Sequence, residues 1–134
     1  MKGRLLILAG VLALCALDAS TQAATHTARA SSTAVGVGER EFKISVYRRT
    51  VPPGEVRFNV QNFGQDAHNL VVLGRSGRPI ATSAEIRAGR RLTLTTKLRR
   101  QGTYRLICTT ADHTRRGMSA KLVVKKPRKK RRRR

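Results

Sequence analysis

The sequence GTYRLICTTADHTRRGM, residues 102–118, joins a strand pattern to a cluster of side chains that bind metals. Apolar side chains recur at every second position from Tyr104 to Cys108, which predicts a strand with one face in a core. His113 and Met118 follow in the spacing Cys-x₄-His-x₄-Met, so that a thiol, an imidazole and a thioether stand together after this strand. The stretch indicates a metal site at the end of a strand.

A second imidazole completes a ligand set. His68 lies upstream, inside a hydrophobic run. Two histidines, one cysteine and a weak axial methionine are the ligands of a blue-copper electron-transfer site. Taken singly, His68 could be a turn residue, His113 a surface residue and Met118 core filler. Together they favour copper, because beyond residue 23 the chain has no Cys or Met other than Cys108 and Met118, and its only other His is His26.

Residues 1–23 have the pattern of a secretory signal peptide. Lys2 and Arg4 precede an apolar segment, residues 5–17, and small residues up to Ala23 offer a cleavage site. The apolar segment is short for a transmembrane helix, and an uncleaved anchor is the alternative. We therefore expect an exported protein, in a periplasmic, extracellular or cell-surface-associated location.

The cysteine count bears on the same site. Cys15 lies within the predicted signal peptide, so Cys108 is the only thiol of the predicted mature chain. Disulfides persist in exported proteins, yet this chain could form no intramolecular one. A lone thiol in an oxidising compartment is a liability unless it is buried, paired with another chain or bound to metal. A buried small hydrophobe is the alternative for Cys108 alone, and the nearby His113 and Met118 weigh against it.

After the signal peptide, the sequence divides into three parts. Residues 24–34 are rich in Ala, Thr and Ser without hydrophobic periodicity, which is typical of a linker. Residues 35–125 carry alternating apolar runs and form one domain, small but able to fold alone. Residues 126–134 form a basic C-terminal tail, which we expect to be disordered because its charges repel one another.

The predicted domain contains short strands separated by turn signals. Residues 52–54, Pro-Pro-Gly, break the chain, and residues 74–79 are turn-like. Residues 69–73 are almost continuously apolar, which is typical of a strand buried on both faces. Residues 81–88 fit a short helix or an irregular crossover. The other expected strands show period-two alternation and lie within residues 42–47, 56–60, 92–98, 104–108 and 120–124. The pattern predicts an all-β sandwich or barrel.

Two segments of the chain resemble the cupredoxins, the family of small blue type 1 copper proteins. They are DAHNLVV, residues 66–72, and GTYRLIC, residues 102–108, taken with His113 and Met118. The loop spacing is most similar to the rusticyanin and sulfocyanin branch of that family. The resemblance implies a Greek-key β-sandwich with one type 1 copper at one end, under the loop that joins the last two strands. It also implies that the metal ligands are His68, Cys108, His113 and Met118.

The resemblance extends to two residues that support the ligands. In cupredoxins, an Asn directly after the first His ligand supports the ligand loop through the hydroxyl residue that follows the Cys. In this chain those positions are Asn69 and Thr109. Such outer partners hold ligands in place and tune the sulfur. The alternative is an ordinary strand Asn and an ordinary loop Thr.

The ligand loop also departs from the family. Many relatives with this loop length carry Pro-Gly before the second His, where this chain has Ala111 and Asp112. Arg115 and Arg116 stand in the region that usually forms an apolar docking patch. Complementary charge steers the approach of a partner, so we expect an acidic redox partner protein.

Both the tail and the domain contribute to the net charge of +22. Residues 125–134 contain nine basic residues; subtracting these, and the +1 of residues 1–23, leaves +12 on residues 24–124. A polycation can bind nucleic acid, but the tail has no base-reading element, and we expect no specific nucleic acid partner. We expect the tail to bind an anionic cell surface or lipid, where each basic residue adds about 1 kcal/mol.

The sequence therefore favours an exported, monomeric copper protein that carries single electrons and is not an enzyme. His113 is expected to form the exposed edge for electron exchange. Two alternatives stay open: a copper storage or delivery protein, and a non-redox β-sandwich that binds anionic surfaces. A fragment of a multicopper oxidase is excluded, because the chain has only three His and lacks the further clusters that such sites require.

Overall fold

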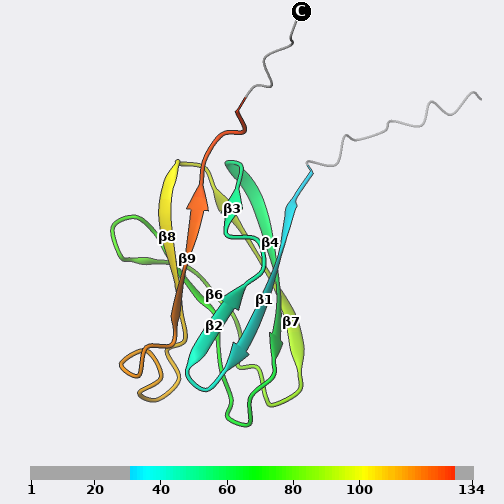
Figure 1. Ribbon diagram of the computed structural model, residues 1–134, viewed down its shortest axis with the longest axis vertical. Coiled ribbons are helices and arrows are strands. Elements are labelled where there is room, and N and C mark those ends of the chain that lie inside the picture. The colour runs from blue at the N-terminus through cyan, green and yellow to red at the C-terminus, as the bar shows by residue number, and fades with distance from the viewer. Residues whose placement is uncertain (1–30, 129–134) are drawn as a thin grey trace, which may run out of the picture.

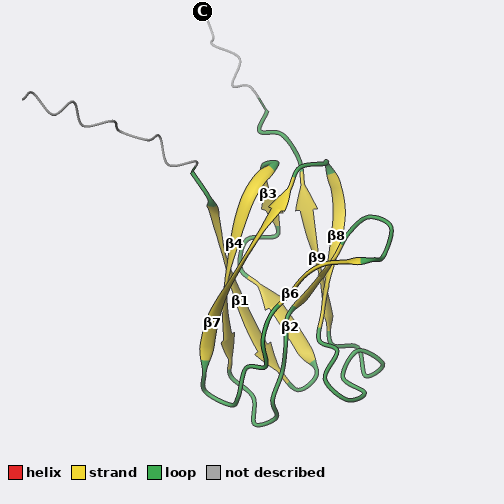
Figure 2. Cartoon of the chain, turned by 180° about the vertical axis from the view of Figure 1, so that it is seen from behind, coloured by secondary structure: helices red, strands yellow, loops and turns green. Residues whose placement is uncertain are grey.

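The computed structural model describes residues 31–128, which form two β-sheets packed face to face (Figures 1 and 2). The nine strands of this part of the chain are β1 (Thr33–Arg40), β2 (Lys43–Val46), β3 (Thr50–Val51), β4 (Gly54–Asn62), β5 (Val71–Leu73), β6 (Pro79–Thr82), β7 (Arg91–Leu98), β8 (Gly102–Ile107) and β9 (Ser119–Val124). One sheet has the order β2-β1-β4-β7 and the other β3-β9-β8-β5-β6. The predicted Greek-key β-sandwich is confirmed.

Both sheets are mixed. β1 runs parallel to β4, and β3 runs parallel to β9, while the remaining neighbours are antiparallel. The parallel pairing of β1 with β4 begins at Thr33, opposite Val56. The ordered sheet therefore starts two residues before the domain boundary expected at residue 35.

Alternating apolar side chains from the two sheets form the core between them. Val56, Phe58 and Val60 of β4 are buried, whereas the residues between them are exposed. Leu106 of β8 and Leu122 of β9 are fully buried from the opposite sheet. Period-two alternation places one face of each strand inward, so the strand patterns expected from the sequence correspond to this core.

The segment before β7 contains no helix. Residues 79–82 form strand β6 at the edge of the second sheet, and residues 83–88 are irregular apart from an isolated bridge between Ile86 and His68. The irregular crossover, one of the two interpretations of residues 81–88, is correct, and the short helix is wrong. Ile86 is buried, so tertiary packing holds this segment without helical hydrogen bonds.

Several expectations concern residues that the structure does not describe. The predicted signal peptide, residues 1–23, most of the predicted linker and the basic tail from residue 129 onward lie outside the described residues. Within residues 31–128, no helix has the length and apolar character needed to cross a membrane.

Candidate metal centre

Sheet register brings the predicted ligands to one end of the sandwich. His68 precedes β5 and Cys108 follows β8, and the start of β5 lies opposite the end of β8 because these neighbours are antiparallel. β9 flanks β8 on its other side, with Ser119 opposite Ile107. Met118 therefore lies beside Cys108, whose backbone N–H donates a hydrogen bond to the Met118 carbonyl at 3.3 Å.

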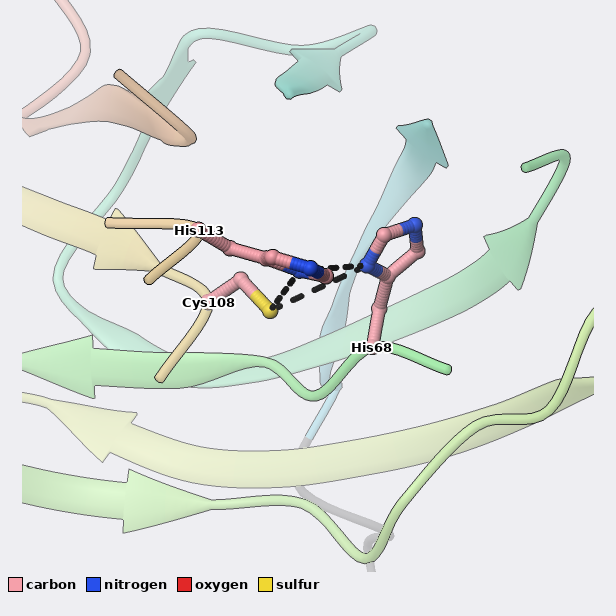
Figure 3. Close-up of side chains that lie close together, drawn as sticks. All are labelled: His68, Cys108 and His113. Carbon is pink, nitrogen blue, oxygen red and sulfur yellow. Dashed lines mark hydrogen bonds between the residues drawn. The ribbon is translucent and has the colours of Figure 1, made fainter. Parts of the chain in front are cut away.

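Three ligand atoms converge in the space between these strand ends (Figure 3). The Sγ atom of Cys108 lies 3.9 Å from Nδ1 of His68 and 3.6 Å from Nδ1 of His113. The two Nδ1 atoms lie 3.2 Å apart. Both imidazoles thus present the same ring nitrogen to one sulfur, and the three atoms form a triangle with sides of 3.2, 3.6 and 3.9 Å.

The triangle fits a trigonal metal ion. In the plane of the three atoms, the point equidistant from them lies about 2.1 Å from each. This distance matches metal–ligand bonds, since those from zinc to imidazole nitrogen and thiolate sulfur are about 2.0–2.3 Å. Two imidazole nitrogens and one thiolate in a trigonal arrangement are the equatorial ligands of a blue-copper site. The donor set therefore suits copper in number, chemistry and spacing.

The four predicted ligands are withdrawn from solvent. His68, Cys108 and Met118 are fully buried, and His113 is 5% exposed. Cys108 and Met118 belong to the main hydrophobic core. Met118 N–H donates to the His113 carbonyl at 3.0 Å, which ties its backbone to the second histidine. The structure brings the two histidines and the cysteine into contact distance and places Met118 in the same buried end.

Burial controls the protonation of the first histidine. Desolvation lowers the pKa of His68, in spite of the nearby Glu41 carboxylate that favours its charged form. The imidazole is therefore neutral at neutral pH, which is the form that binds metals.

Hydrogen bonds between Asn69 and Thr109 link the two segments that carry His68 and Cys108. Asn69 Oδ1 accepts a hydrogen bond from the Thr109 backbone N–H at 2.7 Å, and Asn69 Nδ2 donates to Thr109 Oγ1 at 2.9 Å. The backbone N–H of Asn69 also points at Cys108 Sγ, at 3.5 Å. The hydrogen bonds hold Asn69, which follows His68, against Thr109, which follows Cys108. The Asn69 N–H is directed at the Cys108 sulfur, where it stabilises a thiolate.

Glu41 supports His68 from the turn between β1 and β2. Its Oε1 lies 3.3 Å from Nε2 of His68, the nitrogen that faces away from Cys108. The contact is electrostatic, since His68 Nε2 makes no well-aligned hydrogen bond among the described residues. Glu41 Oε1 also accepts the backbone N–H groups of Gln65 and Asp66, both at 2.7 Å. The Asp66 N–H, the backbone N–H of Glu41 itself and, to a smaller extent, the Gln65 N–H lower the pKa of Glu41 to about 2, so the carboxylate is charged beside the ligand.

The loop before His68 is shaped around this carboxylate. A Cβ atom at Gly64 would overlap the Glu41 carboxylate, so only glycine leaves room for it. Asn62 is fully buried and donates from Nδ2 to the carbonyls of Asp66, at 2.7 Å, and Ile86, at 2.8 Å. Its Oδ1 accepts the Gly64 N–H at 2.8 Å. These contacts hold the loop that delivers the first ligand.

His113 packs against Phe42 and Asp66, and Arg116 covers the Phe42 ring in turn. The Phe42 ring packs edge-on against its imidazole, with centroids 5.0 Å apart. The Arg116 guanidinium lies over the Phe42 ring at 3.5 Å, a cation–π distance. Asp66 Oδ2 lies 3.7 Å from His113 Nε2. The edge of His113 expected to be exposed is therefore largely covered, although His113 is still the most exposed of the four predicted ligands.

Residues 110–117 form a succession of turns between β8 and β9. Ala111 has φ 44°, and Gly117 has φ 96°. Left-handed backbone costs a residue with a Cβ about 1–2 kcal/mol, so Ala111 strains the loop at the position just before Asp112. Thr114 Oγ1 donates to the Cys108 carbonyl, which ties the loop back to the end of β8.

Sequence reasoning missed Glu41, Phe42 and Asn62, and assigned no role at the site to Asp66. Glu41 lies 27 positions before His68 in the chain, and no local pattern links such distant residues. The sequence held one signal for Glu41: acidic residues are rare in this chain, with seven against a net charge of +22, and Glu41 directly precedes the aromatic residue Phe42.

Comparison with known proteins supports the fold. No protein-family model and no curated protein sequence matches the chain. Among solved structures, it is similar to auracyanin B, with a TM-score of 0.64 and 20% identity over 72% of this chain and 91% of that chain. It is also similar to auracyanin A, a "blue" copper protein of Chloroflexus aurantiacus, with a TM-score of 0.62 and 22% identity over 71% of this chain and 100% of that chain. Rusticyanin of Thiobacillus ferrooxidans gives a TM-score of 0.60 and 16% identity over 70% and 77%.

These likenesses agree with the sandwich topology. The resemblance noted in the sequence is confirmed at the level of the fold. The chain has the cupredoxin fold, and it brings His68, Cys108 and His113 together, with Met118 buried beside Cys108, as a candidate type 1 copper site.

Proposed function

We propose that this protein is an exported carrier of single electrons that binds one copper ion in a blue type 1 site. In this proposal, Nδ1 of His68, Nδ1 of His113 and Sγ of Cys108 would hold the copper, and the thioether of Met118 would supply a weak fourth ligand. The observation that carries the proposal is the buried triangle of Nδ1, Nδ1 and Sγ, with sides of 3.2, 3.6 and 3.9 Å.

The surroundings of these residues suit electron transfer. When bound, copper supplies a one-electron couple between Cu(I) and Cu(II). The chain holds the ligands in one geometry through the Asn69–Thr109 hydrogen bonds and the Glu41–His68 contact. A site held by packing and hydrogen bonds keeps its shape on loss or gain of an electron, so little reorganisation opposes the transfer.

The same burial weighs against copper storage or delivery. A protein that hands over a metal ion needs a ligand set that an acceptor can reach. Here His68, Cys108 and Met118 have no exposed surface, and only 5% of His113 is exposed. The buried ligand set likewise offers no open position for a substrate, which supports a carrier over an enzyme.

The partner and the location are part of the proposal. Arg115 and Arg116 are exposed on the turn that carries His113, and positive charge beside the most exposed ligand supports an acidic redox partner. The signal-peptide pattern of residues 1–23 supports export to the periplasm or cell surface. We propose that the carrier acts there as a monomer.

The decisive experiment is the addition of Cu(II) to the purified protein. An intense blue thiolate-to-copper absorption band should develop with one equivalent of copper, and it should bleach on reduction and return on reoxidation with the copper retained. Cys108→Ser removes the thiolate and should abolish the band. Met118→Leu, which removes only the thioether, should keep a blue band with a raised reduction potential.

Two results would contradict the proposal. A protein that binds no copper would exclude the site. A protein that binds copper but loses Cu(I) readily to a chelator would favour delivery over electron transfer.

A further inference from the structure

A cationic groove lies at the end of the sandwich opposite the metal centre. It has a volume of about 810 Å³ and lies between the β5–β6 turn and the end of β7. Its lining includes four exposed basic side chains and, among the described residues, no acidic one. The members used below are Arg75, Ile80, Lys97, Arg99, Arg100 and Tyr104.

Strand β8 separates this groove from the metal centre. Gly102, at the start of β8, lies beside Arg75, and Cys108 follows the other end of the same strand. Six residues of extended chain span about 20 Å. Tyr104 Oη donates to the Arg100 carbonyl at 2.9 Å, which holds the corner between β7 and β8 that carries Arg99 and Arg100.

The arginines of the groove are placed by the fold and are available for a ligand. A Cβ at Gly102 would meet Arg75 Cδ and Nε at 3.1 Å, so the Arg75 side chain lies directly over this glycine. Within residues 31–128, the contacts between a basic side chain and a carboxylate are those of His68 with Glu41 and His113 with Asp66, so none involves an arginine of the groove. Glu55 lies opposite Lys97 in the β4–β7 register. The other three basic residues, Arg75, Arg99 and Arg100, have no carboxylate partner among the described residues.

The basic tail leaves the domain at this same end. Val124, the last residue of β9, pairs with Gly102, and Lys126 N–H donates to Gln101 Oε1 at 3.0 Å. Figure 1 shows the end of β9 at the top of the molecule and the loops around the metal centre at the bottom. The exposed residues Lys125, Lys126 and Arg128 therefore extend the positive charge of the groove, and six further basic residues follow in the sequence.

We propose that this cationic end binds the phosphate headgroups of an anionic membrane, with a headgroup phosphate in the groove and the metal centre facing away from the lipid. Basic side chains near an anionic bilayer are attracted by its surface potential, and guanidinium groups match phosphate geometry. Ile80, which is 45% exposed, lies among these charges and suits the boundary between headgroups and acyl chains. The proposal goes beyond electron transfer and does not depend on copper.

Single-stranded nucleic acid fits this surface less well. Such sites combine a basic groove with exposed aromatic rings on which bases stack. The only aromatic residue in the lining is Tyr104, which is 5% exposed and whose hydroxyl is already bonded to Arg100. A membrane is thus the polyanion that the groove suits better.

The test compares two variants of equal charge in a chain that begins at Ala24. All strands and the core lie within residues 33–124, so omitting residues 1–23 removes no part of the described fold. The groove variant is R75Q/R99Q/R100Q. The control variant is R87Q/R90Q/R91Q, which removes three exposed arginines at the metal end, where Arg91 pairs with Gln61. Circular dichroism verifies that both variants are folded.

Co-sedimentation with vesicles of phosphatidylglycerol and phosphatidylcholine measures the affinity. The groove variant should bind at least tenfold more weakly than the parent at low salt, and the control variant should retain affinity within about threefold, because its lost charges face away from the lipid. Equal losses in both variants would overturn the role of the groove. Equal binding to vesicles of phosphatidylcholine alone would overturn the role of anionic lipid.

Two further arms separate the sources of phosphate. Inorganic phosphate that binds the groove at concentrations too low to displace vesicles would identify a free anion as the ligand and overturn the membrane proposal. A single-stranded oligonucleotide whose binding is lost only in the groove variant, while both variants bind vesicles equally, would replace the membrane with nucleic acid.

The orientation has its own readout. A lipid-soluble spin label in the vesicles should broaden the NMR signals of Gly102 and Arg75 and leave those of Thr114 and Arg115 sharp. Broadening confined to Thr114 and Arg115 would overturn the proposed orientation. Neither readout requires copper, so failure here is distinguishable from failure of the electron-transfer proposal.

Discussion

The Glu41 carboxylate lies 3.3 Å from His68 Nε2, on the side of the imidazole opposite Cys108. Because the same carboxylate accepts two backbone N–H groups of the loop before His68, it fixes both the loop and the ring. A carboxylate behind a metal-bound imidazole raises the basicity of the ligand. Its negative charge should stabilise Cu(II) more than Cu(I).

Glu41→Gln should therefore raise the reduction potential and weaken Cu(II) binding. Loss of such a partner costs about 10–100-fold in metal affinity, and a tenfold loss borne by Cu(II) alone raises a one-electron potential by about 59 mV. Voltammetry of the copper-loaded protein measures the shift. Glu55→Gln removes one negative charge from β4, away from the site, and equal shifts in the two variants would show that only net charge matters.

Substitutions can separate the contributions of the two hydrogen bonds between Asn69 and Thr109. Asn69→Ala removes the side chain that accepts the Thr109 N–H and donates to its hydroxyl, and should cost about 0.5–1.5 kcal/mol of stability, because water can replace the partner that the exposed Thr109 loses. Thr109→Val removes only the hydroxyl, keeps the N–H bond and should cost less. Chemical denaturation with the blue band as a probe measures both.

Thr109→Ser is the control for this series, because it retains the hydroxyl. It should keep stability and potential close to those of the parent. If Asn69→Ala were as stable as Thr109→Ser, the link between the two ligand segments would have no structural role.

Arg115 and Arg116 have different roles despite equal charge. Both substitutions by Gln should slow association with an acidic redox partner and reduce its dependence on salt, because each removes one steering charge. Only Arg116→Gln should also lower stability, by about 0.5–1 kcal/mol, since Arg116 alone lies over the Phe42 ring. Stopped-flow kinetics at several ionic strengths and thermal unfolding measure the two effects separately. Identical unfolding of the two variants would exclude the cation–π contribution.

Glu39 should make stability depend on pH. Its side chain is fully buried, neither carboxyl oxygen has a hydrogen-bond partner among the described residues, and burial raises its pKa from 4.5 to about 7. Between these values the unfolded chain loses the proton and the folded chain retains it, so stability falls as pH rises through this window. The loss is on the order of 3 kcal/mol, from about 1.36 kcal/mol per pKa unit.

Glu39→Gln carries no ionisable group, so it should be more stable than the parent above pH 7 and similar to it near pH 4.5. His68, whose lowered pKa favours folding as pH rises, contributes equally to parent and variant and cancels in the difference. Denaturant unfolding at several pH values measures this difference. A difference that did not change with pH would contradict the raised pKa. Glu85→Gln, at an exposed position, is the control for the loss of one carboxyl group.

The local sequence was sufficient for six of the nine strands in residues 31–128 and for the choice of metal, whereas β1, β3 and β6 were not expected. Period-two alternation in residues 56–60 and 104–108 reflects burial of one strand face, which depends on neighbouring residues only. The ligand types of Cys108, His113 and Met118 are set by copper chemistry, and their spacing lies within one turn region. Strand β6, by contrast, has an exposed face at a sheet edge, so it shows no alternation by which it could have been found.

The partners of the ligands followed from tertiary structure. Glu41, Phe42 and Asp66 reach the two histidines through the β1–β2 turn and the loop before His68, and the pairing of β1 with β4 brings these segments together. The cationic groove and the metal centre lie at opposite ends of β8, and the pairing of β8 with its neighbouring strands places them there. Contacts between residues distant in the chain arise from strand register, and register depends on how whole strands bury their faces together, which no single segment encodes.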